Sequence, residues 1–265
     1  MSKLHVSKYG RASNAPVLVL LHGWGSSSKV WQTCVEKLTE NFQVWCIDLP
    51  GHGESHSVQW DESVAQGLAL LTDIMPERCY LVGWSLGGLY AQLCAAQHPQ
   101  RVQSLMLIAC TVKFVASPDW PHAMAEDKFA KFVARFDASP KVIMKQFRAL
   151  QALHSVSAKE IMRVLEQTAS SQFPLRMAWG LRWLQALDLR NSCIAEKIPI
   201  QLLHGENDQV APLKAANQAM EIWQAKRKNL QFCIINDAGH APFLSHPERF
   251  QQQVNLMLDN KNKPC

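Results

Sequence analysis

A serine flanked by glycines is the strongest chemical signal in the chain. It lies in the segment Gly83-Trp84-Ser85-Leu86-Gly87-Gly88, after an apolar run that predicts a strand and before a helical pattern. Glycines on both sides let the backbone turn sharply, so that the hydroxyl of Ser85 projects at the start of the helix, where backbone N–H groups stabilise negative charge. We therefore predict that Ser85 is a catalytic nucleophile and not an ordinary turn residue.

A serine nucleophile needs a histidine as its base and an acid that orients the histidine. Two loops, each directly after an apolar strand, offer these groups. We predict that Asp208, in the first loop, is the acid, with Glu206 as the fallback, and that His240, in the second loop, is the base. Asp237 is closer to His240 in sequence, but we interpret it as a turn residue.

Acyl transfer to a serine also needs N–H donors that stabilise the oxyanion. One donor is expected from the residue after the nucleophile, which is Leu86. The other is expected from a loop after an early strand, and here the strand over residues 17–21 leads into His22-Gly23-Trp24-Gly25. We predict that the amide of Trp24 is this second donor and that its indole lines the substrate pocket. His22 is expected to shape the loop.

Nucleotide cofactors and metals lack the motifs that they need. Gly23-x-Gly25 and Gly51-x-Gly53 begin like dinucleotide-binding loops, but Ser28 and His56 stand where the third glycine is required. No pair of histidines shows the spacing with an acid that a zinc-binding helix uses. The eight cysteines never fall in a CxxC spacing, so we expect reduced thiols. We expect no cofactor and no metal.

The elements that must position these residues follow an α/β pattern. Apolar strands alternate with helices, which predicts a mostly parallel central sheet flanked by helices. Strands are expected over residues 17–21, 44–48, 80–82, 104–109, 200–204 and 230–235, and helices over 86–98, 213–224 and 247–258. We divide the chain into a first core part (1–112), an inserted helical cap (113–190) and a second core part (191–265).

The predicted cap carries helix-start signals and all of the positive charge. Ser139-Pro140 predicts a helix start, and Ser157 with Glu160 predicts a capping box. The chain has a net charge of +5. Residues 141–190 contain eight basic and three acidic residues, so this segment alone carries a net charge of +5 and the rest of the chain is neutral. Helical spacing places Lys141, Lys145 and Arg148 on one face and Ile143, Phe147 and Leu150 on the opposite face, and Lys159 and Arg163 repeat the basic spacing.

This basic face has two interpretations. It is either a solvated helix face or a docking surface for an acidic protein or an anionic substrate. Nucleic-acid binding is disfavoured, because no aromatic-basic motif accompanies the charge. With 48% hydrophobic and 18% charged residues the chain is not disordered, and glycines and a proline interrupt its longest uncharged stretch, residues 79–100. No signal region is visible at the N-terminus. We expect a cytoplasmic monomer without membrane contact.

Along essentially its full length the chain resembles the α/β-hydrolase superfamily. Within it the chain most resembles the pimeloyl-[acyl-carrier protein] methyl ester carboxylesterases of biotin synthesis. The resemblance rests on segments at the predicted site and on cap phrases, which normally diverge in this superfamily. They are Leu21-His22-Gly23-Trp24-Gly25, Asp48-Leu49-Pro50-Gly51-His52-Gly53-Glu54-Ser55, Gly83-Trp84-Ser85-Leu86-Gly87-Gly88-Leu89, Ala241-Pro242-Phe243-Leu244-Ser245-His246-Pro247, Asp119-Trp120-Pro121, Phe147-Arg148-Ala149-Leu150-Gln151 and Asp188-Leu189-Arg190.

The resemblance implies a serine esterase that hydrolyses the methyl ester of pimeloyl carried on acyl carrier protein and releases methanol. It implies Ser85, Asp208 and His240 as the triad and Trp24 and Leu86 at the oxyanion. It also implies that the run Phe147, Arg148, Ala149, Leu150 and Gln151 lines the acyl path. The family holds its carrier protein with basic cap residues. Two of those positions align with Lys159 and Arg163, and two with Val142 and Gln146, beside Lys141, Lys145 and Arg148.

Other functions remain as alternatives. A generalist esterase or thioesterase leaves the basic cap unexplained, and a carbon–carbon bond hydrolase shares the same triad. A haloalkane dehalogenase is disfavoured, because Ser85 stands where that enzyme needs an aspartate. A binding protein with a hydrolase fold is disfavoured by the complete set of triad residues.

Overall fold

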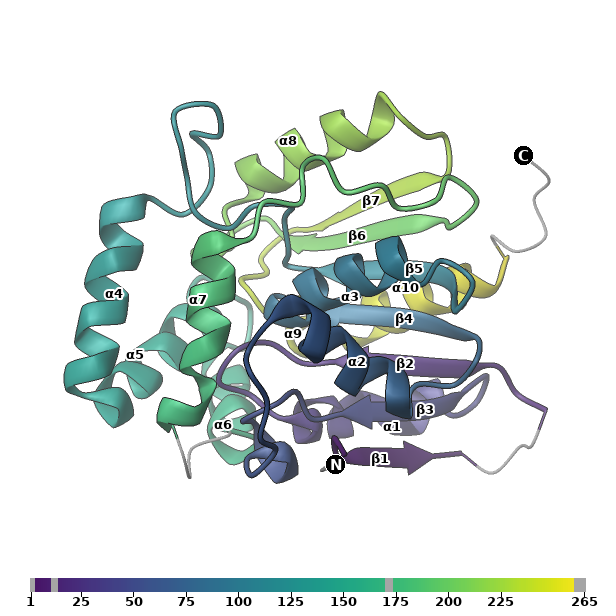
Figure 1. Cartoon of the computed structure of the whole chain (residues 1–265), viewed down its shortest axis with the longest axis horizontal. Coiled ribbons are helices and arrows are strands. Elements are labelled where there is room, and N and C mark those ends of the chain that lie inside the picture. Colours follow the sequence, from purple (N-terminus) through teal and green to yellow (C-terminus); the bar gives the residue numbers. More distant parts are fainter. Residues whose placement is uncertain (1–2, 11–13, 170–173, 260–265) are drawn as a thin grey trace.

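The computed structural model describes residues 3–10, 14–169 and 174–259. A seven-stranded sheet runs through the centre, with the strand order β1-β3-β2-β4-β5-β6-β7 (Figure 1). The edge strand β1 is antiparallel to β3, and the other neighbours are parallel. The strands are β1 (Val6–Tyr9), β2 (Val17–Leu21), β3 (Gln43–Ile47), β4 (Cys79–Trp84), β5 (Val102–Ile108), β6 (Ile200–Gly205) and β7 (Leu230–Ile235).

Helices cover both faces of the sheet, and the side chains of each strand alternate between the two hydrophobic cores. In β2, Leu18 and Leu20 belong to one core, whereas Val19 and Leu21 belong to the other. This alternation explains why the strand is apolar throughout. The helices outside the cap are α1 (Gln32–Leu38), α2 (Val64–Ile74), α3 (Leu86–Gln97), α8 (Leu213–Gln224), α9 (Pro242–Ser245) and α10 (Pro247–Asp259), with 3-10 turns η1 (Ser28–Trp31) and η2 (Gly53–Ser55).

The expected α/β fold is confirmed. β2 and β7 have the predicted bounds, and the other four predicted strands differ by one or two residues at an end. The strand β1 was not expected, because its four residues Val6-Ser7-Lys8-Tyr9 are mixed in polarity and belong to an edge that is only partly buried. The helices α1 and α2 were not expected either.

The chain between β5 and β6 forms helices that lie together at the carboxyl ends of the parallel strands (Figure 1). The two ends of this insertion meet, since Lys113 pairs with Asp188 and the amide of Leu189 donates to the carbonyl oxygen of Val112 at 2.7 Å. Its helices are α4 (Glu126–Ala138), α5 (Pro140–Ala152), α6 (Ala158–Gln167) and α7 (Ala178–Ala186), preceded at α7 by the 3-10 turn η3 (Pro174–Met177). We propose that residues 113–190 act as the cap.

The helix starts of the cap correct two local predictions. α5 begins at Pro140 as expected, but the side chain of Ser139 forms no capping hydrogen bond. The capping box at Ser157 is wrong. A capping serine needs an extended backbone, whereas Ser157 has a φ of 59° and forms no capping bond. The carboxylate of Glu160 instead pairs with Arg163 on the surface of α6.

Two further features concern the described residues. None of their helices is long and apolar enough to cross a membrane.

The seven described cysteines form no disulfide, and five of them are buried; Cys265 lies outside the described residues. Burial raises the pKa of the Cys34 thiol to about 11, so this side chain acts as a small apolar group in the core.

Candidate active site

Ser85 lies at the sharp turn between β4 and α3. Its backbone has a φ of 53° and a ψ of −115°, a conformation that L-residues rarely adopt. The positions two residues before and after Ser85 must be glycine, because other backbone segments pack closely against them. A Cβ at Gly83 would lie 2.3 Å from the carbonyl oxygen of Gly87, and one at Gly87 would lie 2.4 Å from that of Leu21. The strained turn is therefore held by packing that admits only hydrogen at these two positions.

Asp208 and His240 come together from the loops after β6 and β7. The Nδ1 of His240 donates to Oδ2 of Asp208 at 2.8 Å. The other carboxylate oxygen accepts from the amides of Val210 at 2.8 Å and Ala211 at 2.9 Å. Burial acts to raise the pKa of Asp208, but His240, His204 and the amide of Ala211 outweigh it, and the pKa lies below its ordinary value. Asp208 is therefore an anion that orients the imidazole.

The ring of His240 is held so that one nitrogen remains available. Its amide donates to the carbonyl oxygen of Gln151 at 3.0 Å, and its own carbonyl oxygen accepts from the indole of Trp84 at 2.8 Å. With Nδ1 donating to Asp208, the neutral ring carries no proton on Nε2, and this atom is buried without a hydrogen-bond partner. Such a nitrogen can accept the proton of a hydroxyl.

The amides of Trp24 and Leu86 are the two predicted oxyanion donors. Neither donates a hydrogen bond to any of the described residues. Leu86 is the first residue of α3, so its amide has no partner within the helix. The indole of Trp24 donates to the carbonyl oxygen of Met177 at 2.8 Å, which ties the loop after β2 to the cap. The oxyanion role of the two amides remains a prediction from the sequence.

An apolar cavity of about 500 Å³ opens beside these groups. Ser85 and Asp208 form part of its wall, and the cap supplies much of the remainder from α4, α5 and α7. The wall consists of Trp24, Ser85, Phe114, Ala123, Met124, Ala125, Lys128, Phe129, Phe132, Phe147, Leu150, Leu181, Leu184, Asp208, Gln209, Val210 and Pro212. The aromatic residues of α4 were not predicted, although their helical spacing in the sequence is that of a buried face.

The structure corrects the predicted acyl path along α5. Phe147 and Leu150 lie on the cavity wall, but Arg148, Ala149 and Gln151 do not. Successive residues of a helix point in different directions, so a run of five cannot line one cavity. Ala149 is exposed, and Gln151 is buried and contacts His240 through its backbone. Arg148 is half-buried, and its Nε and Nη1 have no partner.

The basic surface is smaller than the sequence predicted. Lys141, Lys145 and Lys159 are exposed. Arg163 is exposed but already paired with Glu160. Arg148 leaves the predicted stripe: burial lowers the pKa of its guanidinium, with Glu166 nearby as the opposing charge. Glu166 belongs to α6, so Arg148 lies near that helix and is only partly exposed.

One buried residue near the acid was missed. Nε2 of His204 donates to the carbonyl oxygen of Ala211 at 2.8 Å and lies 3.4 Å from Oδ2 of Asp208, the oxygen that accepts from His240. His204 belongs to β6 and is buried, and nothing in the sequence indicates its proximity to Asp208. Glu206 is exposed. Asp237 adopts a turn with a φ of 55°, as its interpretation as a turn residue requires. No group of three metal-ligating side chains occurs among the described residues.

The chain is similar in sequence to known proteins. The model of the alpha/beta hydrolase family matches residues 18–253. The pimeloyl-[acyl-carrier protein] methyl ester esterase of Nitrosomonas europaea is 35% identical over 254 residues, which are 94% of this chain and 97% of that protein. The protein of the same name from Vibrio campbellii is 35% identical over 260 residues, 96% of this chain and 97% of that protein.

Solved structures share the fold at lower identity. The enol-lactonase of Burkholderia xenovorans LB400 superposes with a TM-score of 0.80 at 20% identity, over 97% of this chain and 96% of that one. The bromoperoxidase of Bacillus anthracis superposes with a TM-score of 0.82 at 19% identity, over 97% and 95% of the two chains. At these identities the likeness extends to the fold alone.

Proposed function

This chain belongs to the alpha/beta hydrolase family, and on that basis we propose that it is a serine carboxylesterase of biotin synthesis. The substrate is the methyl ester of a pimeloyl chain whose other end is a thioester on acyl carrier protein. Hydrolysis releases methanol and leaves pimeloyl-[acyl-carrier protein]. Support comes from relatives that carry this activity in their name and are 35% identical over nearly their full length. We also propose that the reaction takes place in the cytoplasm, the compartment that the sequence predicts.

The catalytic part of the proposal rests on one observation, the unpartnered Nε2 of a histidine whose Nδ1 is bound to Asp208. In the first step Nε2 of His240 takes the proton of Ser85, and Oγ forms a bond to the ester carbon. The imidazolium then gives that proton to the departing methoxide, which leaves as methanol. Asp208 stabilises the imidazolium throughout but is not itself protonated.

A second half-reaction releases the acyl chain. His240 takes a proton from water, whose oxygen bonds to the acyl carbon. The bond to Ser85 then breaks, and the serine oxygen recovers the proton from the imidazolium. Both half-reactions pass through an oxyanion, and we propose that the amides of Trp24 and Leu86 bind it. Removing one such donor costs about 10²- to 10³-fold in kcat in serine hydrolases.

The cavity suits a methylene chain. Its wall is mostly aromatic and aliphatic, so the pimeloyl methylenes bury apolar surface without leaving a polar group unpaired. Phe147 and Leu150 from α5 and Phe132 from α4 contribute to this wall. We propose that the acyl chain lies here with its ester at Ser85 and its thioester toward the solvent.

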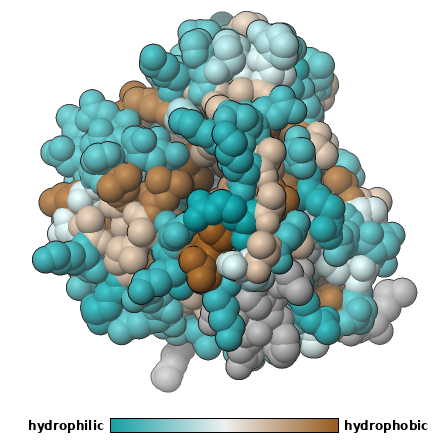
Figure 2. All heavy atoms as spheres, turned by 90° about the vertical axis from the view of Figure 1, so that its left-hand side faces the viewer, coloured by the Kyte–Doolittle hydropathy of each residue, from teal (hydrophilic) through white to brown (hydrophobic). Residues whose placement is uncertain are grey.

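The carrier protein is proposed to dock on the exposed lysines of the cap. The face of the molecule that carries the cap is largely hydrophilic, with apolar side chains exposed among the polar ones (Figure 2). Val142, which follows Lys141 in α5, is 55% exposed. Lys145 and Lys159 are exposed on α5 and α6. A mixed surface of this kind fits an acidic protein partner, because its charges steer the encounter and its apolar groups add contact area.

A comparison of two esters tests the proposal. Purified protein is given methyl-pimeloyl-[acyl-carrier protein] and, separately, an uncharged short-chain chromogenic ester. We expect methanol release from the first with the higher kcat/KM and no release by Ser85→Ala from either ester. Equal kcat/KM for the two would instead support the generalist esterase. Rescue of a bacterial strain that cannot make pimeloyl groups, by the parent chain but not by Ser85→Ala, tests the role in biotin synthesis.

A further inference from the structure

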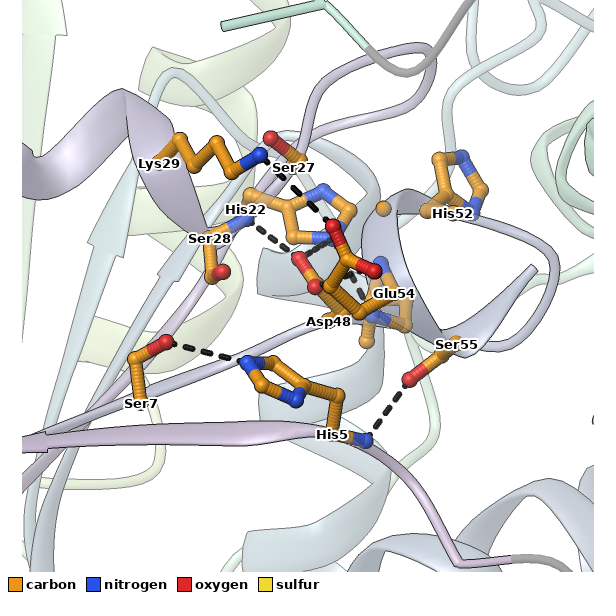
Figure 3. A network of polar contacts seen from close by, with 12 residues as sticks. His5, Ser7, His22, Ser27, Ser28, Lys29, Asp48, His52, Glu54 and Ser55 are labelled. Carbon is orange, nitrogen blue, oxygen red and sulfur yellow. Dashed lines mark hydrogen bonds and ion pairs between the residues drawn. The ribbon is translucent and has the colours of Figure 1, made fainter. Parts of the chain in front are cut away.

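A second buried histidine network lies beside the oxyanion loop and takes no part in the proposed proton transfers. It joins the loop after β2 to the loop after β3 (Figure 3). His22 and His52 are its two imidazoles, and both are fully buried. Their ring centroids lie 5.1 Å apart.

The hydrogen bonds of His22 define its tautomer. Its Nε2 accepts from the amide of Leu49 at 3.0 Å, so this nitrogen carries no proton. Its Nδ1 therefore carries the proton and donates to the carbonyl oxygen of Gly23 at 2.8 Å. Burial lowers the pKa of His22 to about 4, which keeps the ring neutral at physiological pH.

The carbonyl oxygen of Gly23 and the N–H of Trp24 belong to the same planar peptide unit. No peptide bond among the described residues is cis, so these two groups point in opposite directions. The oxygen accepts from His22 and also from the amide of Ser26 at 3.2 Å, and its direction toward His22 turns the N–H of Trp24 away from the network. That N–H is the proposed oxyanion donor.

His52 holds the next peptide unit by the opposite kind of bond. Its Nδ1 donates to the carbonyl oxygen of Pro50 at 2.8 Å, and its Nε2 accepts from the amide of Gly25 at 3.2 Å. The Trp24 residue is thus fixed on both sides, through the oxygen before it and the N–H after it. A Cβ at Gly25 would lie 2.5 Å from the terminal methyl of Met144 in α5, so the cap closes over the same loop.

Asp48 joins the two loops that carry these histidines. Its Oδ1 accepts from the amide of Ser28 at 2.6 Å and its Oδ2 from the amide of Glu54 at 2.9 Å, as Figure 3 shows. The same carboxylate lies 3.9 Å from Nε2 of His22. This carboxylate is buried, so the relative position of the two loops is set by bonds shielded from water.

We propose that His22 and His52 are positioning residues that orient the Trp24 amide toward the oxyanion, one as a hydrogen-bond donor and the other as an acceptor. The inference rests on the proposed esterase function and deepens it. Neither imidazole exchanges a proton with the substrate. Their effect is on the oxyanion alone, so it concerns the transition state and leaves substrate binding unchanged.

Asparagine and glutamine separate the two roles. Asparagine places an amide N–H near the position of Nδ1, and glutamine places a carbonyl oxygen near the position of Nε2. His22→Asn therefore retains the bond to Gly23, whereas His22→Gln loses it. For His52 the order reverses, since His52→Gln retains the bond to the amide of Gly25 and His52→Asn loses it.

We expect kcat on a small chromogenic ester to fall by about 10- to 100-fold in His22→Gln and His52→Asn, less than the loss of a whole oxyanion donor. His22→Asn and His52→Gln should retain most of the parent kcat. KM should change by less than about threefold in all four variants. Affinity for a boronate inhibitor, which adds to the serine as a tetrahedral anion, should follow kcat.

The opposite orders at the two positions separate positioning from general stability, because both members of each pair remove one ring of similar size. Equal losses within each pair, or parent-like kcat in all four variants with an active parent, overturn the inference and leave the esterase function standing. An inactive parent overturns the function and the inference together. In the unmutated protein, ¹⁵N shifts should report the Nδ1–H tautomer for both rings, and an Nε2–H tautomer in either overturns the inference.

Discussion

The indole Nε1 of Trp84 donates to the carbonyl oxygen of His240 at 2.8 Å. Trp84 is the residue before the proposed nucleophile, and His240 is the proposed base, 156 positions further along the chain. One hydrogen bond therefore ties the nucleophile turn to the loop that carries the base. Their separation depends on this contact as well as on the register of the sheet.

Removing that bond should affect both stability and rate. Trp84→Phe retains a ring but leaves the buried carbonyl of His240 without this donor, so we expect the free energy of unfolding to fall by about 1–3 kcal/mol. We expect kcat to fall by about 3- to 10-fold, because the base is less well placed. Urea unfolding and ester hydrolysis measure the two effects. Trp31→Phe is the matched control, since the buried Nε1 of Trp31 has no partner to lose.

The triad should be essential without being structural. Ser85→Ala and His240→Ala should each lower kcat by at least about 10³-fold while the melting temperature stays near that of the parent. Asp208→Asn should be comparably severe, because an amide in place of the carboxylate favours the wrong imidazole tautomer. Glu206→Gln, at an exposed position in the same loop, is the control and should be silent. Parent-like turnover by Asp208→Asn would refute the assignment of the acid.

Stability should decline on mild acidification. Burial lowers the pKa of His22 to about 4 and that of His52 to about 3, against about 6.5 in the unfolded chain. Below pH 6.5 the unfolded chain therefore binds protons that the folded chain excludes. The free energy of unfolding is highest above pH 6.5 and falls by about 1.4 kcal/mol per pH unit for each such histidine as the pH approaches 4.

Urea midpoints at pH 7.5, 6.0 and 5.0 measure this decline. His52→Gln removes one buried imidazole, so its midpoint should depend less steeply on pH. His204, whose pKa burial also lowers, contributes in the same direction in both proteins. A free energy of unfolding that stays constant from pH 7.5 to 5.0 contradicts the presence of neutral buried histidines.

Charge reversal on the cap should affect only the carrier-linked substrate. In Lys145→Glu combined with Lys159→Glu, we expect slower hydrolysis of methyl-pimeloyl-[acyl-carrier protein] at low salt and a parent-like rate on the small uncharged ester. Added salt should reduce the advantage of the parent, because screening acts over about 8–10 Å. Arg148 is not mutated, because its guanidinium is half-buried and its replacement could change folding as well as docking.

A lysine remote from the cap provides the comparison. Lys226 is exposed and follows α8 at the end away from the cap (Figure 1). Lys226→Glu changes the net charge without changing the proposed docking surface, so it should hydrolyse the carrier-linked ester nearly as fast as the parent. If Lys226→Glu slows the reaction by as much for its one reversed charge as the cap variant does for each of its two, the effect depends on net charge and the cap has no special role.

The sequence by itself determined the parts of the protein that depend on local chemistry. The turn at Ser85 needs glycines within two residues, the strands need continuous apolar runs, and parallel strands bring Asp208 and His240 to the same edge of the sheet. These requirements can be recognised from the sequence alone, because each involves residues close together in the chain or the general rules of a parallel sheet.

Only the tertiary structure decided which side of a helix meets which partner. Phe147 and Leu150 reach the cavity, whereas Ala149 is exposed and Arg148 is half-buried near Glu166 of α6, although one run predicted all of them together. The hydrogen bond from His22 to Gly23 is also visible only in the tertiary structure, because its proposed effect on catalysis depends on where the Trp24 N–H points. The physical reason is that helix rotation and loop orientation are set by packing against distant segments, and neighbours in sequence carry no record of that direction.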